Sequence, residues 1–241
     1  MSEWFSTWFD SKYYHILYKN RDFKEAERFI SNVTEQVKLA KSSKVLDLAC
    51  GKGRHSVYLN QLGFDVVGVD LASNSIEKAK TFETQTLKFD VHDMRDPISF
   101  GTFDLIINAF TSFGYFNDPA EDIKTLTHIY HALNPDGIFV FDFLNTHQVV
   151  NNLVAEEQKE IEGVTFNITR KFENKSIYKN ISFRAEGKDF HFQERVDALT
   201  LEDFQKYFDQ IGFNIMDVFG DYDLNPYKPQ DSKRLILVAK K

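Results

Sequence analysis

Short apolar runs alternate with amphipathic stretches up to residue 147, and this alternation constrains the fold more than any other feature of the sequence. Five runs have the length and apolar content of buried strands: 44–48, 64–69, 87–89, 103–109 and 138–143. A helix before the last run is indicated by Asp118 and Pro119, a capping carboxylate followed by proline at the first helical position. Strands that alternate with helices are typical of a parallel sheet covered on both faces.

The pattern changes after His147. Three segments alternate apolar and polar residues, as the strands of an antiparallel meander do: 164–172, 177–185 and 190–198. A capped helix begins near Thr200, and strands 213–219 and 234–239 close the sequence. The sequence therefore predicts an α/β fold, a Rossmann-like seven-stranded doubly wound sheet with helices on both faces and an antiparallel β insertion before the last helix.

The length of 241 residues fits one domain of this class. We expect a single domain, 1–241, with four parts in chain order. They are an aromatic-rich N-terminal helical cap (1–40), a ligand-binding core (41–147), the β insertion (160–198) and the closing helix and strands (199–241). The sequence leaves two hypotheses open for the aromatic side chains of the cap. They pack the first helix onto the domain, or they form a lid whose ring faces line a pocket.

Composition limits the partners and the compartment. The formal net charge of −7 argues against a nucleic-acid partner, because a duplex binder normally carries a basic surface. No apolar stretch has the length of a bilayer span, so we expect no membrane partner. The single Cys50 cannot form an internal disulfide, and no Cys/His metal cluster is visible. We expect a cytoplasmic protein, a monomer or homodimer, without a metal.

A pair of glycines follows the first predicted strand. Gly51 and Gly53 allow a sharp turn and close approach of a ligand at the start of a helix. Asp70 ends the second predicted strand, where it can accept hydrogen bonds from both hydroxyls of a ribose. Glycine pair and strand-end acid together indicate a ligand that carries adenosine.

The residues around this turn indicate which class of adenosine-containing ligand it binds. The nicotinamide dinucleotide fingerprint has a third glycine, where this chain has Ser56, and Lys52 is not followed by the Ser or Thr of a phosphate-binding loop. Asp47, just ahead of the turn, would repel a pyrophosphate and favour a cation. S-adenosylmethionine is a positively charged nucleoside without phosphate, and it is the cofactor that we expect.

Four segments resemble the class I S-adenosylmethionine-dependent methyltransferases. They are VLDLACGKGRH (45–55), GVDL (68–71), DMRD (93–96) and NAFTSFGY (108–115). The resemblance extends over essentially the whole chain and is closest to small-molecule N-methyltransferases that act on sugar amines or glycine. It implies an enzyme that transfers a methyl group to a small-molecule acceptor, with an amine as the expected class.

The resemblance also implies the cofactor contacts. The methionine end would be held by Asp47, Ala49, Gly51 and Gly53, and the ribose by Asp70. Adenine would contact Leu71, Asp93 and Met94, and the methionine portion would lie beside Phe110. In related enzymes an arginine of the N-terminal region pairs with the cofactor carboxylate, for which the candidates here are Arg21 with the neighbouring Tyr14 and Tyr18.

The candidates for catalysis are Tyr115, in the loop that faces the transferred methyl group in the resembled family, and His147, which follows the fifth strand. Tyr115, His147, Tyr13 and His191 are also the candidates for contact with the acceptor. Methyl transfer from a sulfonium has a neutral leaving group, so the rate depends mostly on placing the acceptor in line.

Three alternatives stay open at this point. One is a tRNA methyltransferase, although the loop at Asn108 lacks the Asn/Asp-Pro-Pro-aromatic pattern of enzymes that methylate exocyclic base nitrogens. Another is a nicotinamide-dependent oxidoreductase of Rossmann type, against which Asp47 and Ser56 argue. The third is a module that binds the cofactor without catalysis.

Overall fold

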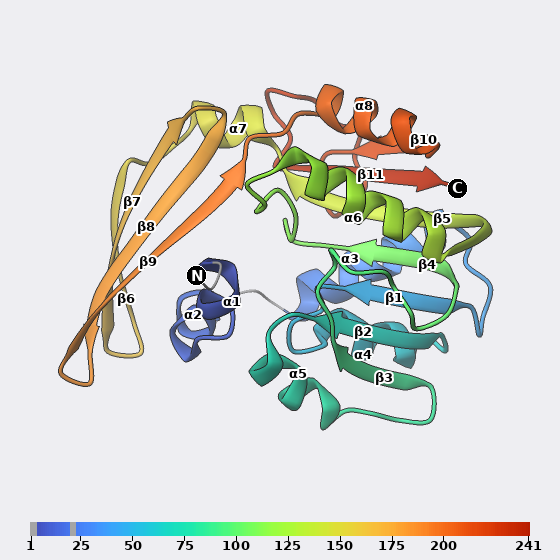
Figure 1. Ribbon diagram of the computed structural model, residues 1–241, viewed down its shortest axis with the longest axis horizontal. Coiled ribbons are helices and arrows are strands. Elements are labelled where there is room, and N and C mark those ends of the chain that lie inside the picture. Colours follow the sequence, from blue (N-terminus) through green and yellow to red (C-terminus); the bar gives the residue numbers. More distant parts are fainter. Residues whose placement is uncertain (1–3, 20–22) are drawn as a thin grey trace.

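A seven-stranded sheet runs through the larger part of the protein (Figure 1), whose computed structural model describes residues 4–19 and 23–241. Its spatial order is β10-β11-β5-β4-β1-β2-β3, and β11 alone runs antiparallel to its neighbours. The strands are β1 (Lys44–Leu48), β2 (Asp65–Asp70), β3 (Leu87–Val91), β4 (Phe103–Asn108), β5 (Leu133–Leu144), β10 (Asn214–Phe219) and β11 (Arg234–Lys240). This is the predicted doubly wound sheet.

Helices cover both faces of this sheet. One face carries α3 (Phe23–Gln36), α4 (Arg54–Gln61) and α5 (Ser73–Lys80), and the other carries α6 (Pro119–Ala132) and α8 (Leu201–Ile211). Adjacent strand residues divide between the two cores: Val45 packs with α3 and α4, whereas Leu46 packs on the side of α6 and α8. Burial on both faces explains the nearly unbroken apolar runs of the sequence.

A four-stranded antiparallel sheet projects beside the main sheet (Figure 1). It consists of β6 (Glu156–Ile161), β7 (Val164–Glu173), β8 (Ser176–Ala185) and β9 (Lys188–Asp197), and the short helix α7 (Thr146–Asn151) leads into it. The sequence predicts the last three strands of this insertion. It does not predict β6, an edge strand whose residues are mostly charged and exposed, which ladder hydrogen bonds to β7 hold in place.

Of the segment 1–40 that the sequence assigns to the cap, α3 packs on the main sheet, and only residues 4–19, which we call the N-terminal cap from here on, lie between the two sheets (Figure 1). Its helices α1 (Trp4–Trp8) and α2 (Lys12–Leu17) form a third apolar core with the antiparallel sheet, in which Trp8 and Leu17 pack with Phe166 and Phe183. Ion pairs from Lys12 to Glu186 and from Lys19 to Glu162 add exposed links to the same sheet. The cap thus packs mainly with the insertion.

Two local predictions need correction. Ser73 or Asn74 looks like the N-cap of α5 in the sequence, but the cap position is Ala72, and Asp10 of the N-terminal cap accepts a hydrogen bond from the Asn74 backbone N–H at 2.8 Å. The segment Asn-Pro-Asp-Gly at 134–137 is typical of a turn, but these residues belong to β5, whose register against β4 is irregular. Within the described part of the chain, no helix has the length and apolarity needed to span a bilayer.

Candidate active site

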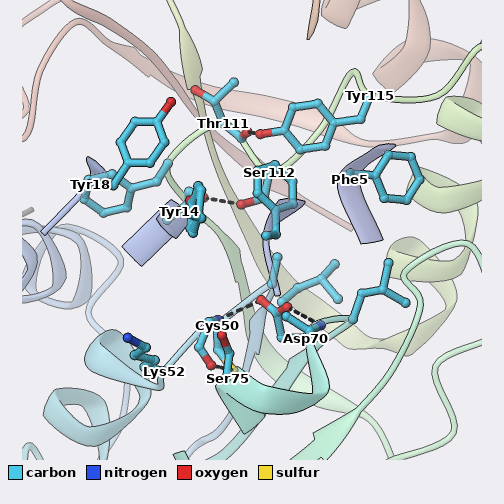
Figure 2. A pocket seen from close by; sticks show the side chains of 18 of the residues that line it. Phe5, Tyr14, Tyr18, Cys50, Lys52, Asp70, Ser75, Thr111, Ser112 and Tyr115 are labelled. Carbon is cyan, nitrogen blue, oxygen red and sulfur yellow. Dashed lines mark hydrogen bonds between the residues drawn. The ribbon is translucent and has the colours of Figure 1, made fainter. Parts of the chain in front are cut away.

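A cavity of about 850 Å³ opens at the carboxyl ends of β1, β2 and β4, beneath the N-terminal cap. It lies where the strand order of the main sheet reverses, between β1 and β4, which is the usual ligand site of an open α/β sheet. Its volume falls within the range of roughly 300–1,000 Å³ found for small-molecule sites. Figure 2 shows Asp70, Cys50 and Lys52 across the cavity from Tyr18, Thr111 and Tyr115.

The glycine turn borders one end of this cavity. Ala49, Gly51 and Gly53 all adopt left-handed backbone conformations, with φ of 64°, 57° and 78°, and α4 begins directly after Gly53. Ala49 and Gly51 line the cavity. Gly53 does not line it: a Cβ atom there would lie 2.6 Å from the Phe89 ring, so this glycine allows α4 and the turn to pack on β3.

Asp47 lies behind the turn instead of facing the cavity. Its side chain is 1% exposed, and one carboxylate oxygen accepts a hydrogen bond from the Ser56 hydroxyl at 2.5 Å. Burial raises the pKa of Asp47 to about 6, against the opposing effect of the Ser56 hydrogen bond. Asp47 does not line the cavity, so its expected direct contact with the cofactor stays a prediction that this geometry does not favour. Asp47 holds α4 to β1 and supplies a buried charge beneath the turn.

Asp70 lies at the end of β2 and lines the cavity. One oxygen accepts the backbone N–H of Gly51 and the other that of Ala72, each at 2.8 Å (Figure 2). Burial raises the pKa of Asp70, although the two backbone donors act in the opposite direction. The carboxylate thus ties the glycine turn to the segment after β2, while its remaining lone pairs can accept hydrogen bonds from a ligand. Leu71 lines the cavity beside it.

Asp93 and Met94 line the cavity beyond β3. The Asp93 carboxylate binds the Arg95 guanidinium, with Nη2 to Oδ2 at 2.6 Å and Nε to Oδ1 at 3.0 Å. Burial works against this charge, but the Arg95 contacts outweigh it and lower the pKa of Asp93. Because the Arg95 guanidinium also lies over the rings of Phe5 and Phe116, it links this end of the cavity to the cap.

A buried network shapes the loop after β4. Phe110 and Thr111 both have left-handed backbones, with φ of 60° and 61°. Asp142, on β5 and fully buried, accepts the Phe110 backbone N–H at 2.7 Å and the Arg234 Nε–H at 2.7 Å. The Tyr222 hydroxyl donates to the same carboxylate at 3.1 Å. This network places Phe110, Tyr222 and Arg234 at the cavity.

Sequence reasoning missed Asp142 and both of its side-chain partners. The available signal was a carboxylate inside the apolar run 138–143, since a charge in a strand buried on both faces requires a partner. The partner Arg234 begins the last strand, far away in the sequence, so its identity could not be read from local pattern.

Tyr115 lies among the aromatic side chains of the cap. Its ring contacts those of Trp4 and Phe9, with centroid distances of 5.3 and 5.4 Å, and its hydroxyl donates a hydrogen bond to the Thr111 carbonyl (Figure 2). Seven rings at the cavity form what we call the aromatic wall: Trp4, Phe5, Phe9, Tyr14, Tyr18, Tyr115 and Phe116. The position of these seven rings agrees with the hypothesis of a lid that lines a pocket. Trp8 and Tyr13 instead pack in the third core, as the other hypothesis expects of the N-terminal rings.

Glu194, on β9, is a second feature that the sequence did not reveal. It lines the cavity next to the aromatic wall and accepts hydrogen bonds from Trp8 Nε1–H at 2.7 Å and from the Tyr18 hydroxyl at 2.8 Å. Its position depends on the pairing of β8 with β9 and on the docking of the cap. No motif in the sequence marks it.

Three predicted contacts with the acceptor do not lie at the cavity. Tyr13 is 6% exposed and packs between the rings of Phe183 and Phe190. His147 lies on α7, which turns away from the end of β5 towards α8, and His191 is exposed on β9. None of the three lines the cavity, so the structure does not bring them together with the other predicted site residues. Arg21 lies outside the described residues.

The other predicted cofactor residues line the cavity, and their contact with the cofactor stays a prediction: Tyr14, Tyr18, Ala49, Gly51, Asp70, Leu71, Asp93, Met94 and Phe110. No group of His, Cys, Asp or Glu side chains within 4–19 and 23–241 is arranged to hold a metal ion.

Comparisons with known proteins agree with this geometry. The family described as a methyltransferase domain matches residues 39–195. The glycine/sarcosine N-methyltransferase of Halorhodospira halochloris is 27% identical over 218 residues, which cover 86% of this chain and 78% of that enzyme.

Two solved structures share the fold. An S-adenosylmethionine-dependent methyltransferase from Clostridium acetobutylicum superposes with a TM-score of 0.80 at 24% identity, covering 95% of each chain. The amino pentose methyltransferase CalS10 from Micromonospora echinaspora, solved with S-adenosylmethionine bound, gives a TM-score of 0.71 at 18% identity. It covers 95% of this chain and 97% of its own.

Proposed function

The chain belongs to the class I S-adenosylmethionine-dependent methyltransferases, and on this premise we propose that it methylates the amino group of a small molecule. The observation that carries the proposal is the single cavity of about 850 Å³ that joins the Asp70 end to the aromatic wall. Both substrates of a methyl transfer must meet in one space that excludes water, and this cavity offers a polar end and an aromatic end.

The residues at the polar end fit S-adenosylmethionine. Asp70 is half-buried, oriented by two backbone N–H groups, and able to accept hydrogen bonds from the ribose hydroxyls. Asp93 and Met94 would border adenine, and the glycine turn would lie against the methionine end. When bound, S-adenosylmethionine supplies a methyl carbon on a positively charged sulfonium. The buried charge of Asp47 beneath the turn favours such a cation over a diphosphate.

The aromatic end supports a small amine as the acceptor. Ring faces attract cations and pack against aliphatic carbon, so a wall of seven rings suits an alkylated amine better than a phosphate or a carboxylate. The cap covers this end, which leaves room for a small molecule and argues against a folded RNA. The names of the relatives, a glycine/sarcosine and an amino pentose methyltransferase, support the same class.

The chain's own residues would act mainly by position. The aromatic wall excludes water, and Tyr115, held by its hydrogen bond to Thr111, fixes one side of the acceptor space. Because the leaving group is a neutral thioether, no oxyanion needs to be stabilised. The site must only hold the acceptor in line and accept one proton from the amine.

Two measurements test this proposal. Isothermal titration should show binding of S-adenosylhomocysteine, and Asp70→Asn should weaken it by about tenfold or more, because hydrogen bonds to a charged group contribute roughly 1.5–3 kcal/mol. Asp90→Asn, an exposed change on β3 away from the cavity, is the matched control and should bind normally.

A turnover assay should then follow formation of S-adenosylhomocysteine with glycine, sarcosine, nucleotide-linked amino sugars, simple alkylamines and bulk tRNA. Turnover with an amine supports the proposal. Turnover with tRNA alone, or no binding of S-adenosylhomocysteine at millimolar concentration, would show that it is wrong.

A further inference from the structure

Glu194 is a carboxylate fixed in the cavity by donors from two different elements. Trp8 Nε1–H of α1 donates to Oε1 at 2.7 Å, and the Tyr18 hydroxyl at the end of α2 lies 2.8 and 2.9 Å from the two oxygens. The side chain is 14% exposed. A carboxylate held this firmly loses little rotamer freedom when a ligand binds it.

The negative charge of Glu194 is balanced by Lys179 on the neighbouring strand. Lys179, paired with Glu194 across β8 and β9, places Nζ 3.5 Å from Oε2 and over the Tyr18 ring at 4.5 Å. Lys179 does not line the cavity, and burial lowers its pKa. The pair therefore presents its carboxylate to the cavity, while its ammonium donates a hydrogen bond to the Tyr18 hydroxyl and does not reach the cavity.

The other acidic side chains that line the cavity are placed differently. Asp70 is bound to backbone N–H groups at the nucleoside end, and Asp93 is bound to Arg95. Glu25 lies in the first turn of α3. Of the described acidic residues at the cavity, Glu194 is the one placed on β9 beside the aromatic wall.

We propose that Glu194 is the binding site for the protonated amino group of the acceptor, and that the acceptor is a compact aliphatic amine enclosed by the aromatic wall. This inference rests on the proposed function and names the residue and the charge state that select the substrate. The carboxylate accepts N–H hydrogen bonds from the ammonium, while the rings of Tyr14, Tyr18 and Tyr115 enclose its alkyl carbons (Figure 2).

The same contact accounts for the proton of the reaction. The bound ammonium gives one proton to Glu194, which passes it to solvent. The nitrogen lone pair then forms the bond to the methyl carbon as the carbon–sulfur bond breaks and its electron pair stays on sulfur. An ammonium and the sulfonium donor thus become a methylated ammonium, a neutral thioether and one released proton.

Binding at Glu194 can be followed by the fluorescence of the two tryptophans of the chain. Trp4 belongs to the aromatic wall and Trp8 donates to Glu194, so intrinsic tryptophan emission reports on ligands that reach the carboxylate. We would titrate the protein, saturated with S-adenosylhomocysteine, with dimethylammonium chloride and with isopropanol as its uncharged control. The wild type should give a saturable change with dimethylammonium alone.

Three variants decide the role of Glu194, compared by the concentration at half-saturation. Glu194→Gln should weaken dimethylammonium binding by about tenfold or more, because it removes a charge-assisted hydrogen bond. Glu160→Gln, exposed on β6, is the matched control and should leave binding unchanged. Lys179→Met should tighten binding by about threefold, because it removes the balancing cation.

The sign of the Lys179→Met effect separates recognition from support of the fold. If Glu194 only anchors the cap, both changes loosen the cap and both weaken binding, which overturns the inference. Equal affinity of wild type and Glu194→Gln, or no saturable change with dimethylammonium in a protein that binds S-adenosylhomocysteine, also overturns it. Failure to bind S-adenosylhomocysteine refutes the proposed function instead.

Discussion

Replacing Asp47 by asparagine should stabilise the fold and weaken binding of S-adenosylmethionine at the same time. The pKa of Asp47 rises from 3.8 to about 6 on folding because its carboxylate is buried. Because of this pKa difference between the folded and unfolded states, ionised Asp47 lowers the free energy of unfolding at pH 8 by about 3 kcal/mol. The new amide lacks an acceptor for its own protons, which costs about 1–2 kcal/mol. We expect a net gain of about 1–2 kcal/mol.

The stabilisation by Asp47→Asn should depend on pH. Between pH 4 and 6 the folded protein keeps the Asp47 proton that the unfolded chain has lost, so the stability of the wild type falls as the pH rises through this window. The advantage of Asp47→Asn should therefore be largest above pH 6 and shrink towards pH 4. Urea unfolding at pH 8, 6 and 4.5 measures it.

Binding provides the second half of the test. At an effective dielectric constant of about 20, the attraction between a carboxylate such as Asp47 and a sulfonium about 8–15 Å away amounts to about 1–2 kcal/mol. Asp47→Asn should weaken S-adenosylmethionine by about fivefold or more, and S-adenosylhomocysteine, which lacks the sulfonium charge, by less. Isothermal titration of both ligands checks this order.

Asp122 offers a matched control, because it is another buried carboxylate that lies away from the cavity. Burial, followed by the charge of Asp197, raises the pKa of Asp122 to about 7, and its Oδ1 has no hydrogen-bond partner. Asp122→Asn should also stabilise the protein at pH 8 but leave both affinities unchanged. The reasoning is refuted if Asp47→Asn leaves the affinity for S-adenosylmethionine intact, or if both variants weaken it equally.

Two further predictions concern the fold around the cavity. Gly53→Ala should lower the free energy of unfolding by at least about 2 kcal/mol more than Gly51→Ala in urea unfolding, because both positions have positive φ but only the Cβ at Gly53 meets Phe89. Phe89→Leu in the same chain should recover part of that loss, and equal costs at the two glycines would contradict the steric explanation. Asp142→Ala should cost about 3–5 kcal/mol in thermal or urea unfolding and weaken S-adenosylhomocysteine, since it leaves the Arg234 charge unpaired. Adding Arg234→Met should restore part of the stability, and a loss below about 1 kcal/mol would count against a buried ion pair.

The elements that follow local rules were predictable from the sequence. β1, β2 and β4 are largely apolar runs because both of their faces are buried, and α8 is preceded by the N-cap Thr200 in a complete capping box. The residues at the ends of these strands, such as Asp70, could be placed at the cavity because parallel strands share one carboxyl edge.

Features that arise from contacts between distant segments were not predictable. The Asp142–Arg234 pair joins β5 to β11, and Glu194 meets Trp8 and Tyr18 only after the cap docks on the antiparallel sheet. The three predicted acceptor contacts that lie away from the cavity, His147 among them, were chosen by nearness to a strand end or to the insertion. Such nearness does not determine the direction of a side chain.

The third apolar core has a consequence for changing what the enzyme accepts. Residues 4–19 and the strands β6 to β9 share a core of their own, apart from the two that flank the main sheet. Substitutions on β9 or α1, except at Phe5 whose ring contacts Arg95, therefore reshape the space for the incoming nucleophile while the nucleoside pocket keeps its packing. Libraries aimed at a new specificity should be confined to that body, and variants can be screened for retained S-adenosylhomocysteine binding before any new product is sought.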